Sequence, residues 1–168
     1  MELISRILDG SIPESLRAAS QTARFFGGRV TQDDKIARLE AVPLLSDCTR
    51  RQLKAVARIT EVIEVPAATV LARQGEPGNE FYLIVDGSAR VEVTPRKRTR
   101  LGPNAFFGEM SLLDGGERSA TVIAETPMRL LVIKRRDFAT LLREAPELTQ
   151  GILATLSRRV RQAEQALG

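Results

Sequence analysis

The sequence feature that most constrains the fold is a series of short apolar segments between residues 61 and 134. Each segment is rich in β-branched or large aliphatic side chains, and glycine, proline or aspartate residues separate it from the next. The segments lie at 61–65, 69–73, 81–85, 89–93, 121–125 and 129–134. Short strands at spacings near ten residues are typical of antiparallel sandwiches and small barrels. The pattern therefore predicts an antiparallel β-core.

One turn inside this region has a specific signature. Asp86-Gly87 stands between two of the apolar segments. Aspartate followed by glycine favours a type I′ turn, because both central positions of that turn need a positive φ. The pair therefore predicts a tight hairpin between the segments at 81–85 and 89–93.

The flanking parts of the chain have helical patterns instead. Capping boxes predict helix starts at Thr31 and Thr49. Apolar residues at helical spacing also precede Gly10. Near the other end, Pro146 suits the first turn of a helix, and an apolar residue recurs every three or four positions as far as Leu167. The order of patterns is helix, strand, helix, which predicts one α+β domain.

The same patterns give the predicted boundaries. We expect an N-terminal helical extension at residues 1–35 and a main domain at residues 36–168. Within the main domain, helices cover 36–60, the β-core covers 61–134, and C-terminal helices cover 135–168.

Composition excludes several classes of function. The 168 residues include no histidine and one cysteine, Cys48. The commonest general base and the usual metal-ligand sets are therefore missing, so the composition argues against an enzyme and against a metal site. No apolar run reaches the roughly 18 residues that a membrane-spanning helix needs. The acidic start of the chain is unlike a signal peptide. We expect a cytoplasmic protein with no membrane insertion.

The charge distribution argues against a nucleic-acid partner. The net charge is +4, and in residues 129–168 Lys and Arg outnumber Asp and Glu by eight to four. An excess of this size is typical of a solvated helix face. Aromatic residues make up only 4% of the chain, and stacking platforms for bases need aromatic rings.

Residues 107–121 form an unusual stretch for a β-protein. Gly108 precedes a predicted single helical turn at 109–113, and two more glycines follow that turn. The free N–H groups at the start of a short helix favour an anion.

Three polar side chains in this stretch suggest what the anion is. Arg118 has a guanidinium group that matches phosphate oxygens, and Ser119 adds a hydroxyl group. Glu109 has a carboxylate, which repels phosphate but accepts hydrogen bonds from sugar hydroxyl groups. Anion donors beside a hydroxyl acceptor predict a site for a ribose phosphate.

The segments Gly108-Glu109-Met110-Ser111-Leu112 and Arg118-Ser119-Ala120-Thr121 resemble the phosphate-binding cassette of cyclic nucleotide-binding domains. This family includes the sensor domains of the catabolite activator protein, of protein kinase A regulatory subunits and of cyclic nucleotide-regulated channels. The resemblance extends over roughly residues 36–165. It implies a jelly-roll-like antiparallel barrel of eight strands, with N-terminal helices and a C-terminal lid helix.

The resemblance also implies roles for residues around the phosphate. Arg118 would pair with the exocyclic oxygens of the cyclic phosphate, and Ser119 would donate a hydrogen bond to it. Backbone N–H groups of the short helix, around Met110 and Ser111, and of Ala120 would complete the anion site.

Further roles concern the rest of the nucleotide. Gly108 would let the backbone approach the ligand, and Glu109 would accept the ribose 2′-OH. Val91 would line the purine side, and Arg159 on the last helix would come near the purine.

The family therefore implies a ligand sensor and not an enzyme. The expected ligand is cAMP or cGMP, with cAMP favoured, and no cofactor is expected. Occupancy would be transmitted through the lid helix and residues 1–35 to a protein effector that the sequence does not identify. The helices also offer a surface through which the chain could form oligomers.

Three other interpretations remain open. The chain could belong to a transcription factor of the same superfamily, although eight residues follow Val160 and we expect no DNA-binding helices after it. It could be the sensor part of a channel or transporter. It could also be a jelly-roll interaction module that has lost its ligand.

Overall fold

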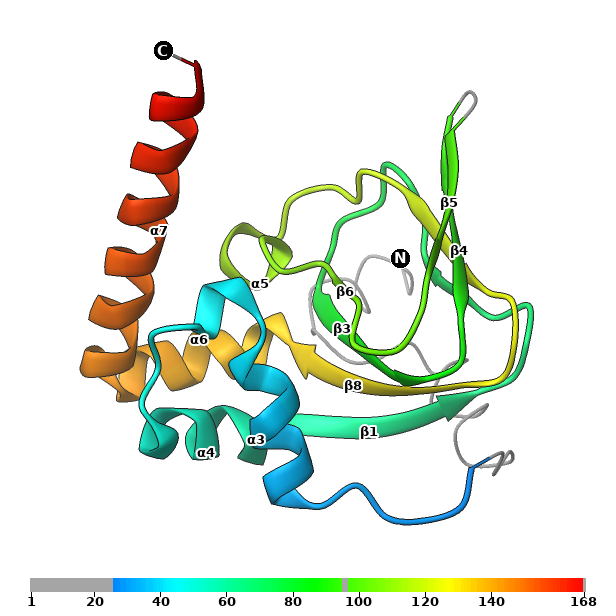
Figure 1. Ribbon diagram of the computed structural model, residues 1–168, viewed down its shortest axis with the longest axis horizontal. Helices are drawn as coiled ribbons and strands as arrows, with labels where there is room; N and C mark the ends of the chain where they lie inside the picture. The colour runs from blue at the N-terminus through cyan, green and yellow to red at the C-terminus, as the bar shows by residue number, and fades with distance from the viewer. Residues whose placement is uncertain (1–25, 95–96, 168) are drawn as a thin grey trace, which may run out of the picture.

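The structure is a computed structural model, and it describes residues 26–94 and 97–167 (Figure 1). The predicted helical pattern before Gly10 lies outside these residues. The described part contains, in chain order, α3 (Gln32–Glu40), η1 (Pro43–Leu45), α4 (Arg50–Arg58), β1 (Thr60–Val65), β2 (Val70–Ala72), β3 (Glu80–Asp86), β4 (Ala89–Val93), β5 (Lys97–Leu101), β6 (Phe106–Phe107), α5 (Ser111–Asp114), β7 (Thr121–Ala124), β8 (Met128–Lys134), α6 (Arg135–Glu144) and α7 (Pro146–Leu167).

The eight strands of the described residues form two antiparallel sheets. One has the strand order β1-β8-β3-β6 and the other β2-β7-β4-β5. The predicted α+β class and the antiparallel core are confirmed, and the sheets do not close into a barrel. The helices gather at one end of the β1-β8-β3-β6 sheet (Figure 1). The strand region ends at Lys134 and α6 begins at Arg135, where the sequence pattern predicts the change.

The central strand β3 is buried on both faces. Phe81, Leu83 and Val85 belong to the cluster of apolar side chains that the helices share. Tyr82 and Ile84 belong to a second cluster, between the two sheets. Because successive side chains of a strand point to opposite faces, β3 connects the two cores. This explains why its sequence is a continuous apolar run without alternation.

Both predicted capping boxes are present. The Thr49 hydroxyl oxygen accepts a hydrogen bond from the Gln52 backbone N–H at 3.2 Å, and the Gln52 side chain accepts one from the Thr49 N–H at 2.9 Å. Thr31 and Asp34 form the same arrangement at the start of α3. The boundary predicted between residues 35 and 36 falls inside α3, whose Ile36 and Leu39 are buried in the helical core.

The predicted hairpin at Asp86-Gly87 is wrong. β3 and β4 belong to different sheets, so the pair forms a corner between the sheets. Gly87 has a φ of +90°, whereas Asp86 does not have a positive φ. A Cβ on Gly87 would overlap the carbonyl oxygen of Pro127. The Asp86 carboxylate accepts a hydrogen bond from Arg129 on β8 at 2.7 Å, so tertiary contacts determine the path of the chain here.

The sequence pattern also misses two strands, β5 and β6. β5 pairs only with β4, at the edge of its sheet, and β6 is a two-residue edge strand beside β3. An edge strand exposes much of its surface and can be polar. The β5 sequence KRTRL therefore lacks the apolar signal that identified the other strands.

Helix α7 begins at Pro146, as predicted, and its C-terminal half extends away from the rest of the fold (Figure 1). Leu148 and Ile152 are buried, whereas Val160 and Leu167 are exposed. Among the described residues, no helix combines the length and the hydropathy that a bilayer crossing requires.

The capping box at Thr49 yields the first prediction. Thr49→Ala removes the hydroxyl group that accepts from the Gln52 N–H, so we expect the free energy of unfolding to fall by about 1 kcal/mol. Thr49→Ser keeps the acceptor and serves as the control, with a smaller loss expected. Urea denaturation measures both values. Equal losses in the two variants would contradict the capping role.

Candidate functional site

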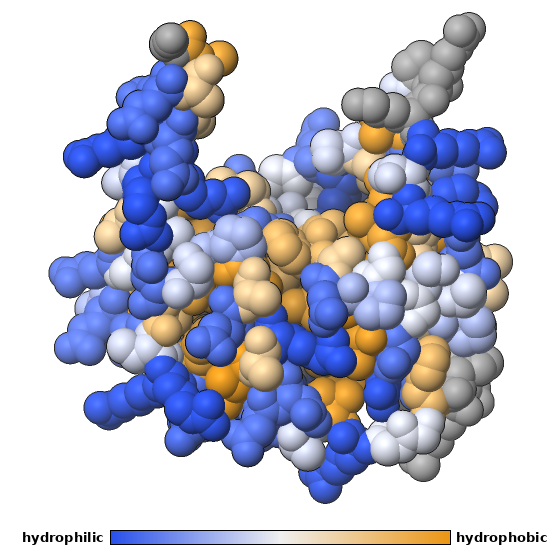
Figure 2. All heavy atoms as spheres, viewed as in Figure 1, coloured by the Kyte–Doolittle hydropathy of each residue, from blue (hydrophilic) through white to orange (hydrophobic). Residues whose placement is uncertain are grey.

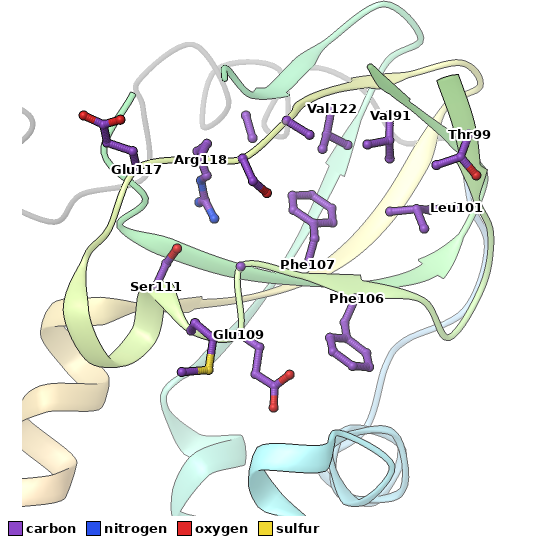
Figure 3. Close-up of a pocket in the computed structure, with 15 residues that line it drawn as sticks. Val91, Thr99, Leu101, Phe106, Phe107, Glu109, Ser111, Glu117, Arg118 and Val122 are labelled. Atoms are coloured by element: carbon purple, nitrogen blue, oxygen red, sulfur yellow. The ribbon is translucent and has the colours of Figure 1, made fainter. Parts of the chain in front are cut away.

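A cavity of about 460 Å³ opens between the β2-β7-β4-β5 sheet, β6 and the start of α5 (Figure 3). Its lining residues are Ala72, Val91, Thr99, Leu101, Phe106, Phe107, Gly108, Glu109, Met110, Ser111, Glu117, Arg118, Ser119, Ala120 and Val122. On the surface of the molecule, apolar residues lie between α7 and the β4–β5 hairpin, which are themselves largely hydrophilic (Figure 2).

Eight of the nine residues predicted as ligand contacts line this cavity: Val91, Gly108, Glu109, Met110, Ser111, Arg118, Ser119 and Ala120. They come from strand β4 and from the stretch between β6 and β7. Arg159 is the exception, since it lies on α7 and is not part of the lining.

Arg118 forms the polar end of the cavity. Arg118 is only 8% exposed. Its Nη2 donates to the Glu80 carbonyl oxygen at 2.7 Å and lies 3.4 Å from Glu80 Oε2. Its Nη1 is buried and has no hydrogen-bond partner in the described part of the chain. A buried cationic donor without a partner carries a large desolvation penalty, which an anion beside this atom would reduce.

Hydrogen bonds between two loops fix the position of Arg118. The Arg118 N–H donates to the Glu76 carbonyl oxygen at 2.7 Å, and the Gly75 N–H donates to the Arg118 carbonyl oxygen at 2.9 Å. Next to them, Pro77 and Glu117 form an isolated antiparallel bridge. The backbone of this loop is thus held on both sides, which directs the guanidinium group inward (Figure 3).

Gly108 makes room for that guanidinium group. Its φ is +82°, and a Cβ there would overlap Arg118 Nη1 and come within 2.6 Å of the Glu80 carbonyl oxygen. The glycine is therefore required both by its conformation and by the close approach.

The short helix after Gly108 begins later than predicted. α5 covers Ser111–Asp114, with Met110 at the N-cap and no side chain capping it. Ser111 is buried, and Leu112 packs into the core shared by the helices. α5 therefore connects the cavity with the helical part of the fold.

The opposite end of the cavity is mainly apolar. Val91 on β4 lies across from Thr99 on β5 and from Val122 on β7. Leu101 on β5 also contributes to this wall (Figure 3). Thr99 is the polar side chain among them, and its hydroxyl group can donate or accept a hydrogen bond.

Sequence reasoning missed Thr99 and Leu101 because it did not recognise β5 as a strand. A signal was present, since Thr99 and Leu101 alternate with Arg98 and Arg100. Alternation with period two places the first pair on one face of a strand. Phe106 and Phe107 were missed because a two-residue strand leaves no periodic pattern.

Glu109 is held by the last helix. Arg159 Nη1 donates to Glu109 Oε1 at 2.9 Å, and the Glu109 side chain is 11% exposed. The carboxylate is directed away from Arg118 (Figure 3). The arrangement brings Arg159 to the predicted ribose-binding residue and not to the apolar end of the cavity.

The neighbouring Arg158 fixes α7 at a second point. Its guanidinium group pairs with Asp47, and the Thr155 hydroxyl group donates to the same carboxylate at 2.9 Å. These hydrogen bonds hold the pKa of Asp47 below its ordinary value. α7 is therefore attached both to the cavity wall and to the connection between η1 and α4.

Burial changes the acidity of two further side chains near the core. Burial raises the pKa of the Cys48 thiol to about 11, with a smaller contribution from Asp47, so Cys48 is not an activated nucleophile. Burial also raises the pKa of the Tyr82 hydroxyl group. No group of three potential metal-binding side chains occurs among the residues that the structure describes.

Comparison with known proteins identifies the class to which this fold and cavity belong. The sequence profile of the cyclic nucleotide-binding domain matches residues 62–145. The chain therefore belongs to the cyclic nucleotide-binding domain family, whose members include receptors, kinase regulatory subunits and channels.

Individual relatives match the greater part of this chain. A cyclic nucleotide-gated potassium channel of Mesorhizobium japonicum is 42% identical over 66% of this chain and 30% of its own length. The cyclic AMP receptor protein of Thermus thermophilus is 38% identical over 61% of this chain and 50% of its own length. The chain thus spans between 30% and 50% of the length of these relatives.

The solved structures give the same fold. The N-terminal domain of a transcriptional regulator from Streptomyces coelicolor has a TM-score of 0.70 and 27% identity. The match covers 77% of this chain and 96% of that domain.

The close approach at Gly108 yields the second prediction. Gly108→Ala places a Cβ against Arg118 and the Glu80 backbone, and we expect the free energy of unfolding to fall by about 1–3 kcal/mol. Gly102→Ala is the control, because no atom lies within 4 Å of its new Cβ. Urea denaturation should separate the two variants, and similar stabilities would show that the backbone moves to accommodate the methyl group.

Proposed function

We propose that the protein binds a 3′,5′-cyclic purine nucleotide in this cavity and transmits its occupancy to a partner. The observation that carries the proposal is the buried, unpartnered Nη1 of Arg118 at the polar end of the cavity. A cyclic phosphate supplies the negative charge and the acceptor oxygens that this atom lacks. A charge-assisted hydrogen bond of this kind is stronger than one between neutral groups.

The phosphate lies, in this proposal, between Arg118 and the start of α5. Ser119 is exposed at the rim and its hydroxyl group donates to the phosphate. Backbone N–H groups at Met110, Ser111 and Ala120 contribute further donors, while Gly108 permits the close approach of the ligand.

The ribose lies next to Glu109. The carboxylate already accepts from Arg159 through Oε1, so a ribose 2′-OH either shares this carboxylate or displaces Arg159 from it. In both cases the ligand and α7 interact with the same group. A ligand that changes the Glu109–Arg159 contact changes the position of α7, because a shift in population requires a differential interaction with the two states.

The purine lies against Val91 and the apolar end of the cavity. Thr99 and Ser119 can each donate or accept, so neither excludes adenine or guanine. One neutral hydrogen bond contributes about 0.5–1.5 kcal/mol, or roughly a factor of ten at most. Both nucleotides therefore bind with less than about a hundredfold preference, and cAMP is the favoured ligand.

The output follows from the contacts of α7. Its two adjacent arginines attach it to the cavity wall through Glu109 and to the helical region through Asp47. Movement of α7 relative to α3 and α4, together with residues 1–35, carries the signal to a protein effector. The protein acts as a sensor and catalyses no reaction.

Removal of the phosphate-binding charge tests the proposal directly. In Arg118→Gln the buried phosphate has no cationic partner, which costs about 3–5 kcal/mol and weakens binding by between about a hundred and several thousandfold. Arg100→Gln removes an arginine that is exposed and lies outside the cavity lining, and it should leave binding unchanged. Calorimetric titration with cAMP and with cGMP measures both variants. Unchanged affinity in Arg118→Gln would refute the assignment.

The proposed contact between Glu109 and the ribose is tested with a ligand that lacks the 2′-OH. Glu109→Gln should weaken binding of cAMP by about tenfold or more, because a hydrogen bond to a charged group contributes about 1.5–3 kcal/mol. Binding of 2′-deoxy-cAMP should change little. Glu117→Gln alters another carboxylate of the cavity lining and is the control. Equal losses for both ligands would mean that Glu109 only positions the backbone or α7.

A further inference from the structure

A buried carboxylate, Glu80, lies beside the proposed phosphate-binding arginine and has no role in the site so far. Glu80 is the first residue of β3 and is 8% exposed. Its Oε2 lies 3.4 Å from Arg118 Nη2, the same atom that donates to the Glu80 carbonyl oxygen. The two charged groups are thus buried together, and Arg118 Nη1 lies next to Gly108 of the cavity lining.

Few other charged groups face Glu80. Lys134 on β8 lies opposite Glu80 in the strand pairing, but its ammonium group forms an ion pair with Glu61 at 3.1 Å. Tyr82, two residues further along β3, has a buried hydroxyl group without a hydrogen-bond partner in the described residues. Arg118 is therefore the cation nearest the Glu80 carboxylate, while the Asn79 backbone and, more weakly, Lys134 also favour its ionised form.

Binding of a phosphate creates a competition for this cation. A phosphodiester remains ionised throughout the neutral range and cannot take up a proton, whereas a carboxylate can. With the ligand bound, two anions would share one buried guanidinium group, and like charges at short range disfavour the ionised form of the group that can be protonated.

We propose that Glu80 takes up a proton when the ligand phosphate binds to Arg118, so that nucleotide binding at this site is coupled to proton uptake. The inference rests on the proposed function and adds a regulatory property to it. The proton comes from solvent and forms a bond with one Glu80 carboxylate oxygen. The charge of Arg118 is then balanced by the phosphate alone.

The electrostatics of the empty site support this direction. Burial raises the pKa of the Glu80 carboxyl group above its ordinary value, and Arg118 is the largest opposing influence. A bound phosphate weakens that opposing influence and raises the pKa further. By linkage, binding becomes tighter as the pH falls through the pKa of the ligand-bound form and levels off below the pKa of the empty form.

The composition of the chain makes the effect measurable. The sequence contains no histidine, which is the side chain whose ordinary pKa lies in the range between pH 5 and 8. Few other side chains therefore take up or release protons near pH 6.5, so proton uptake by Glu80 can be measured against a small background.

The experiment is calorimetric titration of the full chain with cAMP at pH 6.5, in two buffers of different ionisation enthalpy. The difference in apparent binding enthalpy gives the number of protons taken up. We expect a clear uptake, of at most one proton per ligand, and an affinity that rises by up to tenfold per pH unit as the pH falls from 7.5 to 5.5.

Glu80→Gln keeps the size of the side chain and cannot be protonated in this range. It should bind cAMP without proton uptake and with an affinity that changes little with pH. Glu125→Gln is the matched control, because Glu125 also pairs with an arginine, Arg100, at 3.0 Å but outside the cavity lining. It should retain the uptake of the unaltered chain.

The outcomes separate this inference from the proposed function. Binding of cAMP without proton uptake, or the same uptake in Glu80→Gln, overturns the inference and leaves the proposed function intact. Absence of binding to the unaltered chain overturns both. If Glu80→Gln does not fold, infrared spectroscopy of the unaltered chain decides the matter, since the band of a protonated carboxyl group must appear when cAMP is added.

Discussion

The burial of one guanidinium group determines most of the local structure around the cavity. Arg118 is withdrawn from solvent, and a buried cation is stable only when anions or carbonyl oxygens surround it. Glu80 supplies a carbonyl oxygen and a carboxylate to one side of it. Because Gly108 has no side chain, it leaves room for Nη1 of the guanidinium group. Backbone hydrogen bonds of Arg118 with Glu76 and Gly75 tie the loop before β7 to the loop before β3.

The cavity and the helices are connected through a shared strand. Along β3, Phe81 and Leu83 pack among the helices, whereas Tyr82 faces the other sheet and stacks on Phe107 of the cavity wall at 4.9 Å between ring centroids. Arg118 lies over the Tyr82 ring. The cavity wall and the helical core are therefore packed against each other through a single strand and through Leu112 of α5.

Local signals in the sequence predicted much of this architecture. The capping boxes at Thr31 and Thr49, and the start of α7 at Pro146, depend on contacts within one or two helical turns. The glycine pattern around Gly108 and the arginine ten residues later predicted an anion site, and the structure brings these residues together in one cavity lining. By contrast, Asp86-Gly87 gave a wrong prediction, because the sheet to which β4 belongs depends on which side chains it buries and not on the turn itself.

By itself, the sequence determined the classes of group available: no histidine, one short segment with the side chains that a phosphate site would need, and most of the strands and helices. Only the tertiary structure decided which of these groups meet. It brought Glu80 to Arg118 across 38 positions of the chain, and Arg159 to Glu109 across 50. Neither pair leaves a pattern in the sequence, because a glutamate or an arginine in an apolar or helical segment looks the same whether its partner is water or a buried charge. Burial selects the partner, and burial is a property of the folded chain.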